Sequence, residues 1–594
     1  MYKRRLLLTL VLVLSLVLAA CGGASETQDS SQGSEPADTG AAAPSAPAVD
    51  DSQYERSETL YTSGTMWGPP SNWNPMMDWA RATGTFGLAY ESLFHYDPLT
   101  NEYTPWLAES GDWTSDNVYE LTVREGITWS DGEEFTAEDV QFTFELGQQF
   151  DALFYSPLWD FLDSVEVDDR TVTFTFTESL YQKWANYLYT LPIVPQHIWG
   201  EYSEEEVTAG PNENPVGTGP YTAETFSEDR MVWLRNPNWW GTEALGMEMA
   251  PKRIVDIVNS DNNTALGLVL QGQLDLSNNF LPGIASLTSG AGGHSVKTYY
   301  EEPPYMLAAN TAWLVTNNAK APMDDPEFRK ALAHSVNVDQ IVERVYDNIV
   351  SKASPTGMLP YWEDYVDQQV VDELGFSHDA DQARQLLADA GYEDTNGDGM
   401  VETPDGEEIA LQIIVPNGWT DWMEAVRVIS SSAQDVGINI EPDFPDADAL
   451  TDARNSGNFD LLIANERQVS NTPWTYYDWM FRQPITDTMT AGNYGRYENQ
   501  EAADLVTELD KTEIDDQEGM QEVISELQRI HLEDMPIIPL WYNGLWAQYN
   551  DSVWTNWPSA DSDNNALPTT WQGYWEMTAL DMLANLEPAP AEGE

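Results

Sequence analysis

Tryptophan is the residue type that most clearly suggests ligand binding in this sequence, because it is frequent, with 24 in 594 residues, and stands beside polar residues. Many stand among Asn, Asp, Thr and Gly, in stretches such as 66–74, 417–422, 471–479 and 541–546. The flat face of an indole ring stacks on the C–H face of a sugar ring, while amides and carboxylates bind hydroxyl groups. This combination predicts an oligosaccharide-binding cleft; the alternative is that such tryptophans pack a core or a hinge. The residues expected to bind the ligand are Trp67, Trp73, Asn74, Trp419, Trp422, Trp474, Trp479, Trp541 and Trp546.

A second pattern, of oxygen-bearing side chains, lies at residues 394–405, which read DTNGDGMVETPD. Carboxylate and amide oxygens stand at positions 1, 3, 5, 9 and 12 with glycine at 6, as in an EF-hand calcium loop. The twelfth residue is Asp instead of the bidentate Glu, and a flanking helix is expected on the N-terminal side only. The stretch predicts either an Asp- and Asn-rich turn that joins a helix to a strand or a site for a structural calcium ion, and both interpretations stay open. The ligands of the ion would be Asp394, Asn396, Asp398, Glu402 and Asp405.

The sequence has no recognisable pattern of catalytic residues. Its six histidines stand singly, without an HExxH pair, and no GxSxG or CxxC pattern occurs. We therefore expect the protein not to be an enzyme, and to need no cofactor unless a structural calcium ion is bound at 394–405. A surface carbohydrate-active enzyme that uses two carboxylates is a remote alternative.

The first residues have the pattern of an export signal. Basic residues at 3–5 precede an uncharged apolar run at 6–18, which is shorter than the ~20 residues that a membrane-spanning helix needs. The run ends in Leu-Ala-Ala-Cys at 18–21, which resembles the lipobox of bacterial lipoproteins; an ordinary signal peptide is the alternative. We expect a signal peptide at 1–20, a lipid on Cys21 and a disordered tether at 21–53. The protein would then lie on the outer face of the cell membrane, or in the periplasm.

The elements that must position these residues mix strands and helices, which predicts an α/β fold. Thr136 has the position of a helix N-cap, and Gly391 that of a helix C-cap. Residues 217–220, which read GTGP, predict a tight structural loop and not a phosphate-binding loop, because a third glycine and a following helix are missing. The predicted strands are 121–123, 172–176 and 537–541, and the predicted helices are 137–148, 325–345, 381–390 and 520–532.

Charge and length exclude several classes of partner and architecture. The formal net charge is −73, from 99 acidic and 26 basic residues. Nucleic acid and anionic lipid bind to basic faces, so neither is expected as a partner. Because Cys21 is the only cysteine, disulfides and cysteine-based metal sites are excluded. The body from residue 54 onwards is too long for one compact core, and we expect a monomer with several lobes.

Several segments, in a consistent order over nearly the whole body, resemble solute-binding protein family 5, the peptide/nickel-type binding proteins of ABC importers. They include YESLF at 90–94, PWLAE at 105–109, FTAEDV at 135–140, PVGTGPY at 215–221 and RNPNWW at 235–240. The resemblance implies a periplasmic-binding-protein-like fold of cluster C type, in which two lobes close on the ligand about a hinge and a third domain is inserted. It implies lobe I at 54–91, 212–310 and 541–594 (the last with the C-terminal tail), the inserted domain at 92–211, and lobe II at 311–540.

Two details favour a sugar over a peptide within this family. Peptide-binding members are expected to have an acidic anchor after a tryptophan in lobe II, whereas the matching stretch, 474–478, reads WTYYD, with the carboxylate displaced. The stretches 63–70 and 418–422 resemble members that bind cello- and manno-oligosaccharides. We therefore expect an extracytoplasmic subunit that captures a β-linked, cellobiose- or mannobiose-like oligosaccharide and delivers it to ABC permease subunits. An oligopeptide is the alternative ligand, and a nickel chelate or another solute is a more remote one.

Overall fold

The computed structural model describes residues 54–64, 68–77, 81–259, 261–290, 296–482, 484–562, 564, 566–569 and 576–590. These residues belong to one compact unit, 47–594. The predicted signal peptide 1–20, Cys21, the tether 21–53 and Trp67 lie outside the described residues. Within the described ranges, none of the helices combines the length and the apolar character that crossing a membrane requires.

A seven-stranded sheet takes strands from distant parts of the chain. Strand β1 (Thr59–Ser63) runs parallel to β10 (Arg253–Ile257) on one side and to β11 (Leu276–Ser277) on the other. Most residues of β1 are buried, as expected of an inner strand with both faces covered. The other strands of the seven-stranded sheet are β8 (Tyr221–Ser227), β9 (Arg230–Arg235), β12 (Val296–Lys297) and β19 (Gln548–Asn550). The helices of the same segments are α5 (Gly241–Ala244), α6 (Asn262–Leu270), α7 (Ile284–Thr288) and α17 (Ala579–Asn585).

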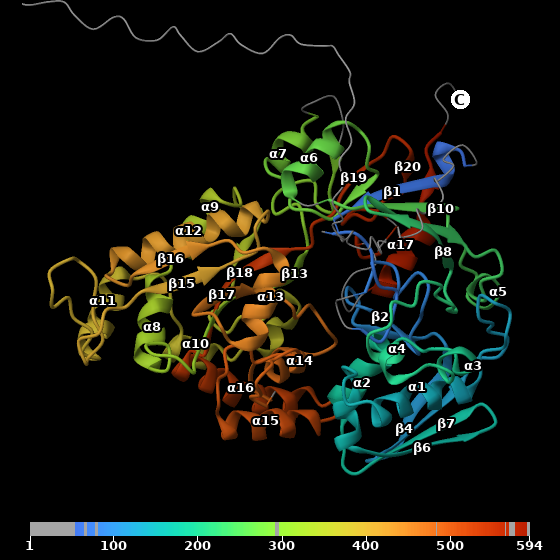
Figure 1. Cartoon of the computed structure of the whole chain (residues 1–594), viewed down its shortest axis with the longest axis horizontal. Helices are drawn as coiled ribbons and strands as arrows, with labels where there is room; N and C mark the ends of the chain where they lie inside the picture. The colour runs from blue at the N-terminus through green and yellow to red at the C-terminus, as the bar shows by residue number, and fades with distance from the viewer. Residues whose placement is uncertain are drawn as a thin grey trace, which may run out of the picture. The chain divides into compact units, whose positions relative to one another are not determined.

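A six-stranded sheet is built around the antiparallel pair β13 (Ala308–Thr316) and β18 (Ile537–Gly544). Next to β13 comes β17 (Leu461–Ala464), which runs parallel to β15 (Leu411–Ile414). The order is completed by β14 (Ser351–Lys352) and β16 (Ile440–Asp443) at the two edges. Figure 1 shows helices on this part of the chain in colours from yellow-green to red-orange. They are α8 (Pro326–Ser335), α9 (Val338–Arg344), α10 (Gln368–Leu374), α11 (Ala380–Asp389), α12 (Thr420–Asp435), α13 (Ala447–Ser456), α14 (Trp474–Tyr477), α15 (Gln500–Asp510) and α16 (Gln517–Asp534).

A four-stranded antiparallel sheet lies between β3 and β8 in the sequence. Strand β7 (Thr171–Phe176) alternates half-buried and buried residues, the pattern of a strand with one face on the core. Helix α1 (Ala137–Gln149) packs on this sheet (Figure 1). The other strands are β4 (Ala108–Ser115), β5 (Val118–Val123) and β6 (Leu162–Asp168); the other helices are α2 (Tyr181–Thr190), α3 (Gln196–Trp199) and α4 (Glu204–Thr208); and two small sheets pair β2 (Phe94–Asp97) with β3 (Glu102–Pro105) and β20 (Trp554–Thr555) with β21 (Glu587–Pro588).

The chain passes between the two larger sheets at two short connections. One joins β12 to β13 and the other joins β18 to β19. Two short connections of this kind suit a hinge, since few residues must change their backbone angles when two bodies move. The predicted boundary between 540 and 541 lies inside β18, which continues in the six-stranded sheet to Gly544. The division into two lobes and an inserted domain stays a prediction.

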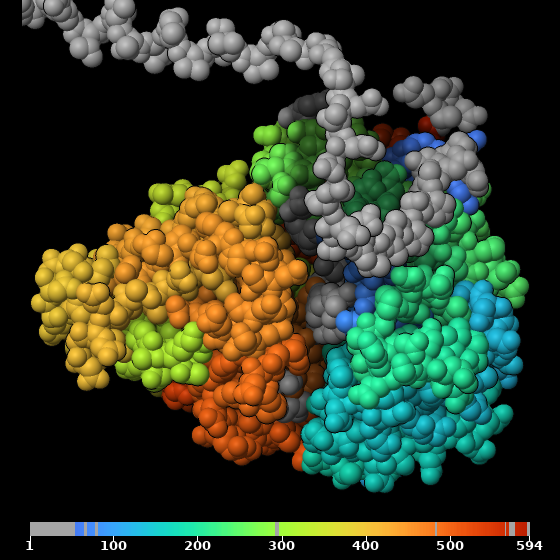
Figure 2. All heavy atoms as spheres, in the orientation of Figure 1, coloured from blue at the N-terminus to red at the C-terminus, as the bar shows by residue number. Residues whose placement is uncertain are grey.

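Helix α2, which follows the four-stranded sheet, contacts the segment of the six-stranded sheet. Thr472 donates its hydroxyl to Gln182 Oε1 (2.7 Å), and Gln182 Nε2 donates to the carbonyl oxygen of Thr512 (2.9 Å). Lys511 forms an ion pair with Glu178 beside them. Figure 2 shows the orange and cyan surfaces of these segments meeting. The segment of the four-stranded sheet is therefore in direct contact with the segment of the six-stranded sheet.

Most of the elements expected from local patterns are confirmed. Thr136 caps α1, and its side chain pairs reciprocally with Asp139 across the first turn. A Cβ atom on Gly217 would lie 1.9 Å from the Ala89 carbonyl oxygen, so the 217–220 loop does require glycine there. The structure has the expected strands 121–123, 172–176 and 537–541 as β5, β7 and β18. It has the expected helices 137–148, 381–390 and 520–532 as α1, α11 and α16, and the ends of all six elements differ from the expected ones by at most a few residues.

One expected helix, 325–345, is wrong as a single element. The structure has α8 and α9 there, separated at Val336 and Asn337. Asn337 leaves the helical conformation and its side chain accepts a hydrogen bond from the Gln340 backbone N–H. An internal N-cap of this kind starts a new helix, so the apolar periodicity alone overestimated the length.

Candidate functional site

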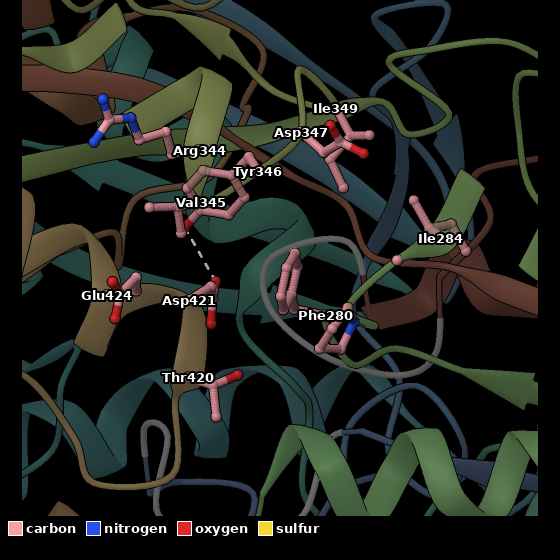
Figure 3. A pocket seen from close by; sticks show the side chains of 12 residues that line it. Phe280, Ile284, Arg344, Val345, Tyr346, Asp347, Ile349, Thr420, Asp421 and Glu424 are labelled. Carbon is pink, nitrogen blue, oxygen red and sulfur yellow. Dashed lines mark hydrogen bonds between the residues drawn. The ribbon is translucent and has the colours of Figure 1, made fainter. Parts of the chain in front are cut away.

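A cavity of about 340 Å³ lies between a loop of the seven-stranded-sheet segment and two helices of the six-stranded-sheet segment. The loop contributes Phe280 and Ile284. Across the cavity stand Tyr346 and Asp421, whose side chains point toward one another (Figure 3). Its volume falls in the range of small-ligand sites, ~300–1,000 Å³. The remaining lining residues are Pro282, Gly283, Arg344, Val345, Asp347, Ile349, Thr420 and Glu424.

Local sequence explains why these side chains stand at element ends. Phe280 closely follows β11, and Tyr346 follows the last turn of α9. Asp421 lies in the first turn of α12, after Gly418, which has φ +94° and allows the chain to turn into the helix. A carboxylate in the first turn of a helix is favoured by the positive end of the helix dipole. The cavity is thus framed by residues at a loop and at two helix ends, and Phe280, Tyr346 and Asp421 are themselves buried.

The Asp421 carboxylate is buried and has polar partners from two other segments. Tyr346 donates its hydroxyl to one carboxylate oxygen (3.0 Å), and Asn262 Nδ2 donates to the other (3.1 Å). Burial raises the pKa of Asp421 from 3.8 to about 6, against the lowering effect of these hydrogen bonds. Burial also raises the pKa of Tyr346 well above its ordinary value, and the neighbouring carboxylate adds to this rise.

Aromatic rings stand side by side behind Tyr346 and Phe280. The rings of Tyr346 and Trp546 are stacked with 12° between their planes and 6.2 Å between their centres. Trp546 also meets the edge of Phe280 at 5.2 Å, and Trp541 lies 5.3 Å from Tyr346. These rings come from three segments that are far apart in sequence, and together they make one aromatic wall.

Four of the predicted ligand-binding tryptophans are neighbours, in space or in sequence, of residues that line this cavity, but none of the four lines it. Trp541 and Trp546 contact Tyr346, while Trp419 and Trp422 flank Asp421 in sequence and pack against each other at 4.8 Å. Trp419 and Trp546 are half-buried, whereas Trp422 and Trp541 are buried in the core. Their contact with a ligand stays a prediction.

The other predicted ligand-binding residues lie in two different cores. Trp73 is buried and packs at 4.3 Å on Phe226, and Asn74 donates to the Val207 carbonyl oxygen. Trp474 and Trp479 are buried in the core that covers the six-stranded sheet. The structure does not bring these four residues to the cavity, and their role in binding stays a prediction. Trp67 lies outside the described residues.

Most of the described tryptophans are buried. Only Trp113, Trp159, Trp419 and Trp546 among the described ones are half-buried. The tryptophan excess of the sequence is therefore mostly core packing, which was the alternative interpretation of the pattern.

Sequence reasoning missed three residues that define the cavity: Phe280, Tyr346 and Asp421. The sequence could have indicated Asp421, because this residue stands between two predicted ligand-binding tryptophans in the 418–422 stretch. Phe280 and Tyr346 have no local signal. They face each other only because separate segments of the fold converge.

The predicted calcium loop brings three carboxylates together. Ligand atoms of Asp394, Asp398 and Glu402 lie within 4.8 Å of one another. This spacing fits the rim of a calcium site, where oxygens lie ~2.3–2.6 Å from the ion. Asp405 is exposed and does not belong to the group.

Hydrogen bonds within the loop also satisfy these oxygens. Glu402 is buried and accepts from the Thr395 backbone N–H (2.7 Å) and from Asn396 Nδ2 (2.7 Å). Asp394 accepts from the backbone N–H groups of Gly397 and Gly399. The geometry is thus compatible with both an ion and a self-contained turn, and calcium stays a prediction.

Comparison with known proteins places these features in context. Residues 102–487 match the family described as bacterial extracellular solute-binding proteins, family 5 Middle. The oligopeptide-binding protein AppA of Bacillus subtilis is 22% identical over 553 residues, which cover 91% of this chain and 94% of that protein. The match extends over nearly the whole body.

Solved structures resemble the fold over the same extent. A periplasmic oligopeptide-binding protein of an oligopeptide ABC transporter from Thermotoga maritima, with mannohexaose bound, is 43% identical with a TM-score of 0.85, covering 90% of this chain and 99% of that one. NikZ from Campylobacter jejuni, in complex with Ni(L-His), has a TM-score of 0.74 at 17% identity, covering 90% of this chain and 100% of that one, and so shows a likeness of fold alone. The predicted α/β, periplasmic-binding-protein-like fold class is confirmed.

Proposed function

This chain belongs to the bacterial extracellular solute-binding proteins of family 5, and from that premise we propose that it captures a β-linked, cellobiose- or mannobiose-like oligosaccharide in the cavity beside Asp421. It is the solute-binding subunit of an ABC importer. Capture follows if the ligand contacts both sides of the cavity and so favours a closed arrangement over an open one. The ligand class is the part of this proposal that needs an experiment.

The observation that carries the sugar proposal is the aromatic wall of the cavity. Tyr346 and Phe280 line it, and Trp546 stacks on Tyr346. Aromatic rings stack on the C–H side of pyranose rings, while the exposed carboxylates of Asp347 and Glu424 in the cavity lining offer acceptors for hydroxyl groups. The relative that is 43% identical and has mannohexaose bound supports the same ligand class.

An oligopeptide is the second candidate ligand. A full-length relative is an oligopeptide-binding protein, and the 43% identical one also has that name. Arg344 and Asp347 line the cavity together with Asp421. Side chains of both signs would suit the charged ends of a peptide.

The proposal includes a lipid on Cys21 that holds a monomer at the outer face of the cell membrane. A tether at 21–53 would let the body reach the permease. The proposed role is to carry a solute without changing it chemically, in keeping with the carrier role of the family. Intact recovery of the bound sugar after long incubation would support this role, and its cleavage would favour a carbohydrate-active enzyme.

Isothermal titration calorimetry of the mature protein tests the ligand class. The probes are cellobiose, mannobiose and a tripeptide, each added to the same preparation. Heat with either disaccharide and none with the tripeptide is expected. Heat with the tripeptide alone would replace the sugar proposal by the peptide one.

A further inference from the structure

We infer that Asp421 is a positioning residue for ligand capture: it joins α6 to α12 beside the cavity and fixes the Tyr346 ring in the cavity wall. The inference deepens the proposed function and rests on it only in naming the cavity as the ligand site. Asp421 acts through its two partners, so it need not touch the ligand itself.

The two bonds of Asp421 connect parts of the fold that the chain keeps far apart. Asn262 is the first residue of α6, in the segment of the seven-stranded sheet, and its side chain is buried. Asp421 lies in α12, in the segment of the six-stranded sheet. The hydrogen bond between Asn262 Nδ2 and the carboxylate therefore holds only while these two segments stay together beside the cavity.

The bond to Tyr346 orients an aromatic face. The Tyr346 hydroxyl is pinned by Asp421 at 3.0 Å, and the ring is held between the cavity and Trp546. A ring fixed at both ends loses little rotational freedom when a ligand stacks on it. Opening the bond to Asn262 would remove one of the donors that hold Asp421, and so would loosen the wall.

The charges around Asp421 are few. Arg344 and Asp347 come from the segment that contains Tyr346, Glu424 comes from α12, and Asp261 precedes Asn262 at the start of α6. The loop that faces them contributes Phe280, Pro282, Gly283 and Ile284, which do not titrate. Burial raises the pKa of Asp421 to about 6, so the joined arrangement takes up a proton more readily than an arrangement in which water reaches the carboxylate.

The direction of the pH effect follows from this. Between pH 7.5 and pH 5 the joined arrangement becomes more favourable as Asp421 is protonated, and ligand affinity should rise by several-fold, up to about tenfold. Asp421→Asn is neutral at every pH, and its amide can still accept from Asn262 and donate to the Tyr346 oxygen. This variant is expected to fold and to lose the pH dependence of affinity.

Affinity measurements on four variants test the bond. Asn262→Ala and Asp421→Ala should each weaken binding of mannohexaose or of the tripeptide by about tenfold, because a hydrogen bond to a charged group is lost. The double variant should lose less than the sum of the two single losses, since both changes remove the bond between Asn262 and Asp421. It should not match a single variant, because Asn262→Ala also removes the bond to Thr420 Oγ1 (3.4 Å) and Asp421→Ala also removes the bond to Tyr346. Asn263→Ala, the next residue along α6 with an exposed side chain, is the matched control and should bind as the wild type does.

A measurement without ligand separates this inference from the proposed function. Because Cys21 is the only cysteine, a Cys21→Ser background with Ser286→Cys on α7 and Ala388→Cys on α11 accepts two spin labels at exposed positions. Pulsed electron paramagnetic resonance should show a longer and broader distance distribution after Asn262→Ala than before. This expectation holds whether a sugar or a peptide is the ligand.

The ligand class and the role of Asp421 can fail independently of each other. Failure of both sugars to bind, with the label distances still lengthened by Asn262→Ala, would reject the sugar proposal and keep the role of Asp421. Additive losses in the double variant, unchanged label distances and an unchanged pH profile in Asp421→Asn would together overturn the inference, even if sugar binds tightly.

Discussion

Among the predicted ligand-binding tryptophans, Trp546 contacts both aromatic residues that line the cavity. Its ring is half-buried, stacks on Tyr346 and meets Phe280, both of which line the cavity. Its backbone oxygen accepts from Asn278 Nδ2, which fixes the loop that follows β18. A residue held this firmly can offer its face to a ligand with little loss of entropy.

Trp546→Ala should therefore weaken oligosaccharide binding by roughly tenfold, through loss of stacking and of support for Tyr346. Calorimetric titration and ligand-induced change of tryptophan fluorescence measure this. Trp113→Ala is the matched control, since Trp113 is also half-buried but lies in β4 of the four-stranded sheet. Equal affinity of both variants and the wild type would remove Trp546 from the site.

Glu91 shows how the sequence uses tryptophan away from the cavity. Its carboxylate is fully buried and accepts the indole N–H groups of Trp106 (2.8 Å), Trp239 (3.1 Å) and Trp240 (2.9 Å). Burial raises the pKa of Glu91, while these donors act in the opposite direction. The group joins the YESLF and RNPNWW segments of the sequence and is structural.

Glu91→Gln should lower the free energy of unfolding by about 1–3 kcal/mol, because one acceptor oxygen becomes a donor that faces an indole N–H. Urea denaturation followed by fluorescence measures the change. Glu120→Gln, at an exposed position of β5, should leave the free energy of unfolding close to that of the wild type. A loss as small as that of the control would mean that the three indoles find other partners.

The pH dependence of stability should reveal Asp421. Its pKa is raised to about 6 in the native state, so its contribution is most favourable at low pH and declines as pH rises through 6. Relative to Asp421→Asn, the wild type should lose roughly 1 kcal/mol of unfolding free energy between pH 5 and pH 7.5. Denaturation of both proteins at the two pH values measures the difference; a constant gap between them would contradict a raised pKa.

At the scale of elements, the 394–405 loop joins α11 to β15 across a segment with three clustered carboxylates. The backbone N–H of Val401 donates to the Gly437 carbonyl oxygen, which ties the loop to the end of α12. A bound ion would brace this connection. It would have no part in capturing the solute, because these residues do not line the cavity.

Removal of calcium with EGTA should lower the melting temperature by about 2–6 °C if the ion is bound. Asp398→Asn removes one carboxylate and should make the protein insensitive to EGTA, whereas Asp448→Asn, an exposed acid of α13, should leave the response intact. Elemental analysis of the purified protein gives the bound metal directly. No calcium and no shift in melting temperature would leave the loop as a self-contained turn.

At the scale of the whole molecule, the proposed attachment to a membrane is through a lipid on Cys21, since none of the described helices is long and apolar enough to cross a membrane. The chain has a net charge of −73, so electrostatic attraction to anionic lipid does not offer a substitute for a lipid anchor. The anchor would keep a carrier near its permease while the body remains free to bind solute.

Cys21→Ser should move the protein from the membrane fraction to the soluble fraction of an expressing bacterium. Mass spectrometry of the wild type should find a lipid on the new N-terminal cysteine. A matched Ser25→Ala change in the tether should alter neither result. Wild-type protein that is soluble and free of lipid would favour an ordinary signal peptide.

Local patterns predicted much of the fold because they depend on neighbours in the sequence. The cap at Thr136, the tight loop at 217–220 and the alternation in β7 are decided by a few adjacent residues. The helix expected at 325–345 failed for a local reason too, since the cap at Asn337 outweighed the apolar periodicity. The wider family resemblance came from ordered segments over the whole body and is confirmed.

The sequence by itself thus determined the α/β class, the family and the presence of many tryptophans among polar residues. Only the tertiary structure decided which of these tryptophans stand beside a cavity. Trp474 and Trp546 both stand among polar residues in sequence, yet Trp474 is buried in the core over the six-stranded sheet, whereas Trp546 is half-buried and stacks on Tyr346. A side chain becomes buried when segments that are distant in sequence meet in space, and local sequence does not show which segments meet. The contact of Asn262 with Asp421 arises in the same way.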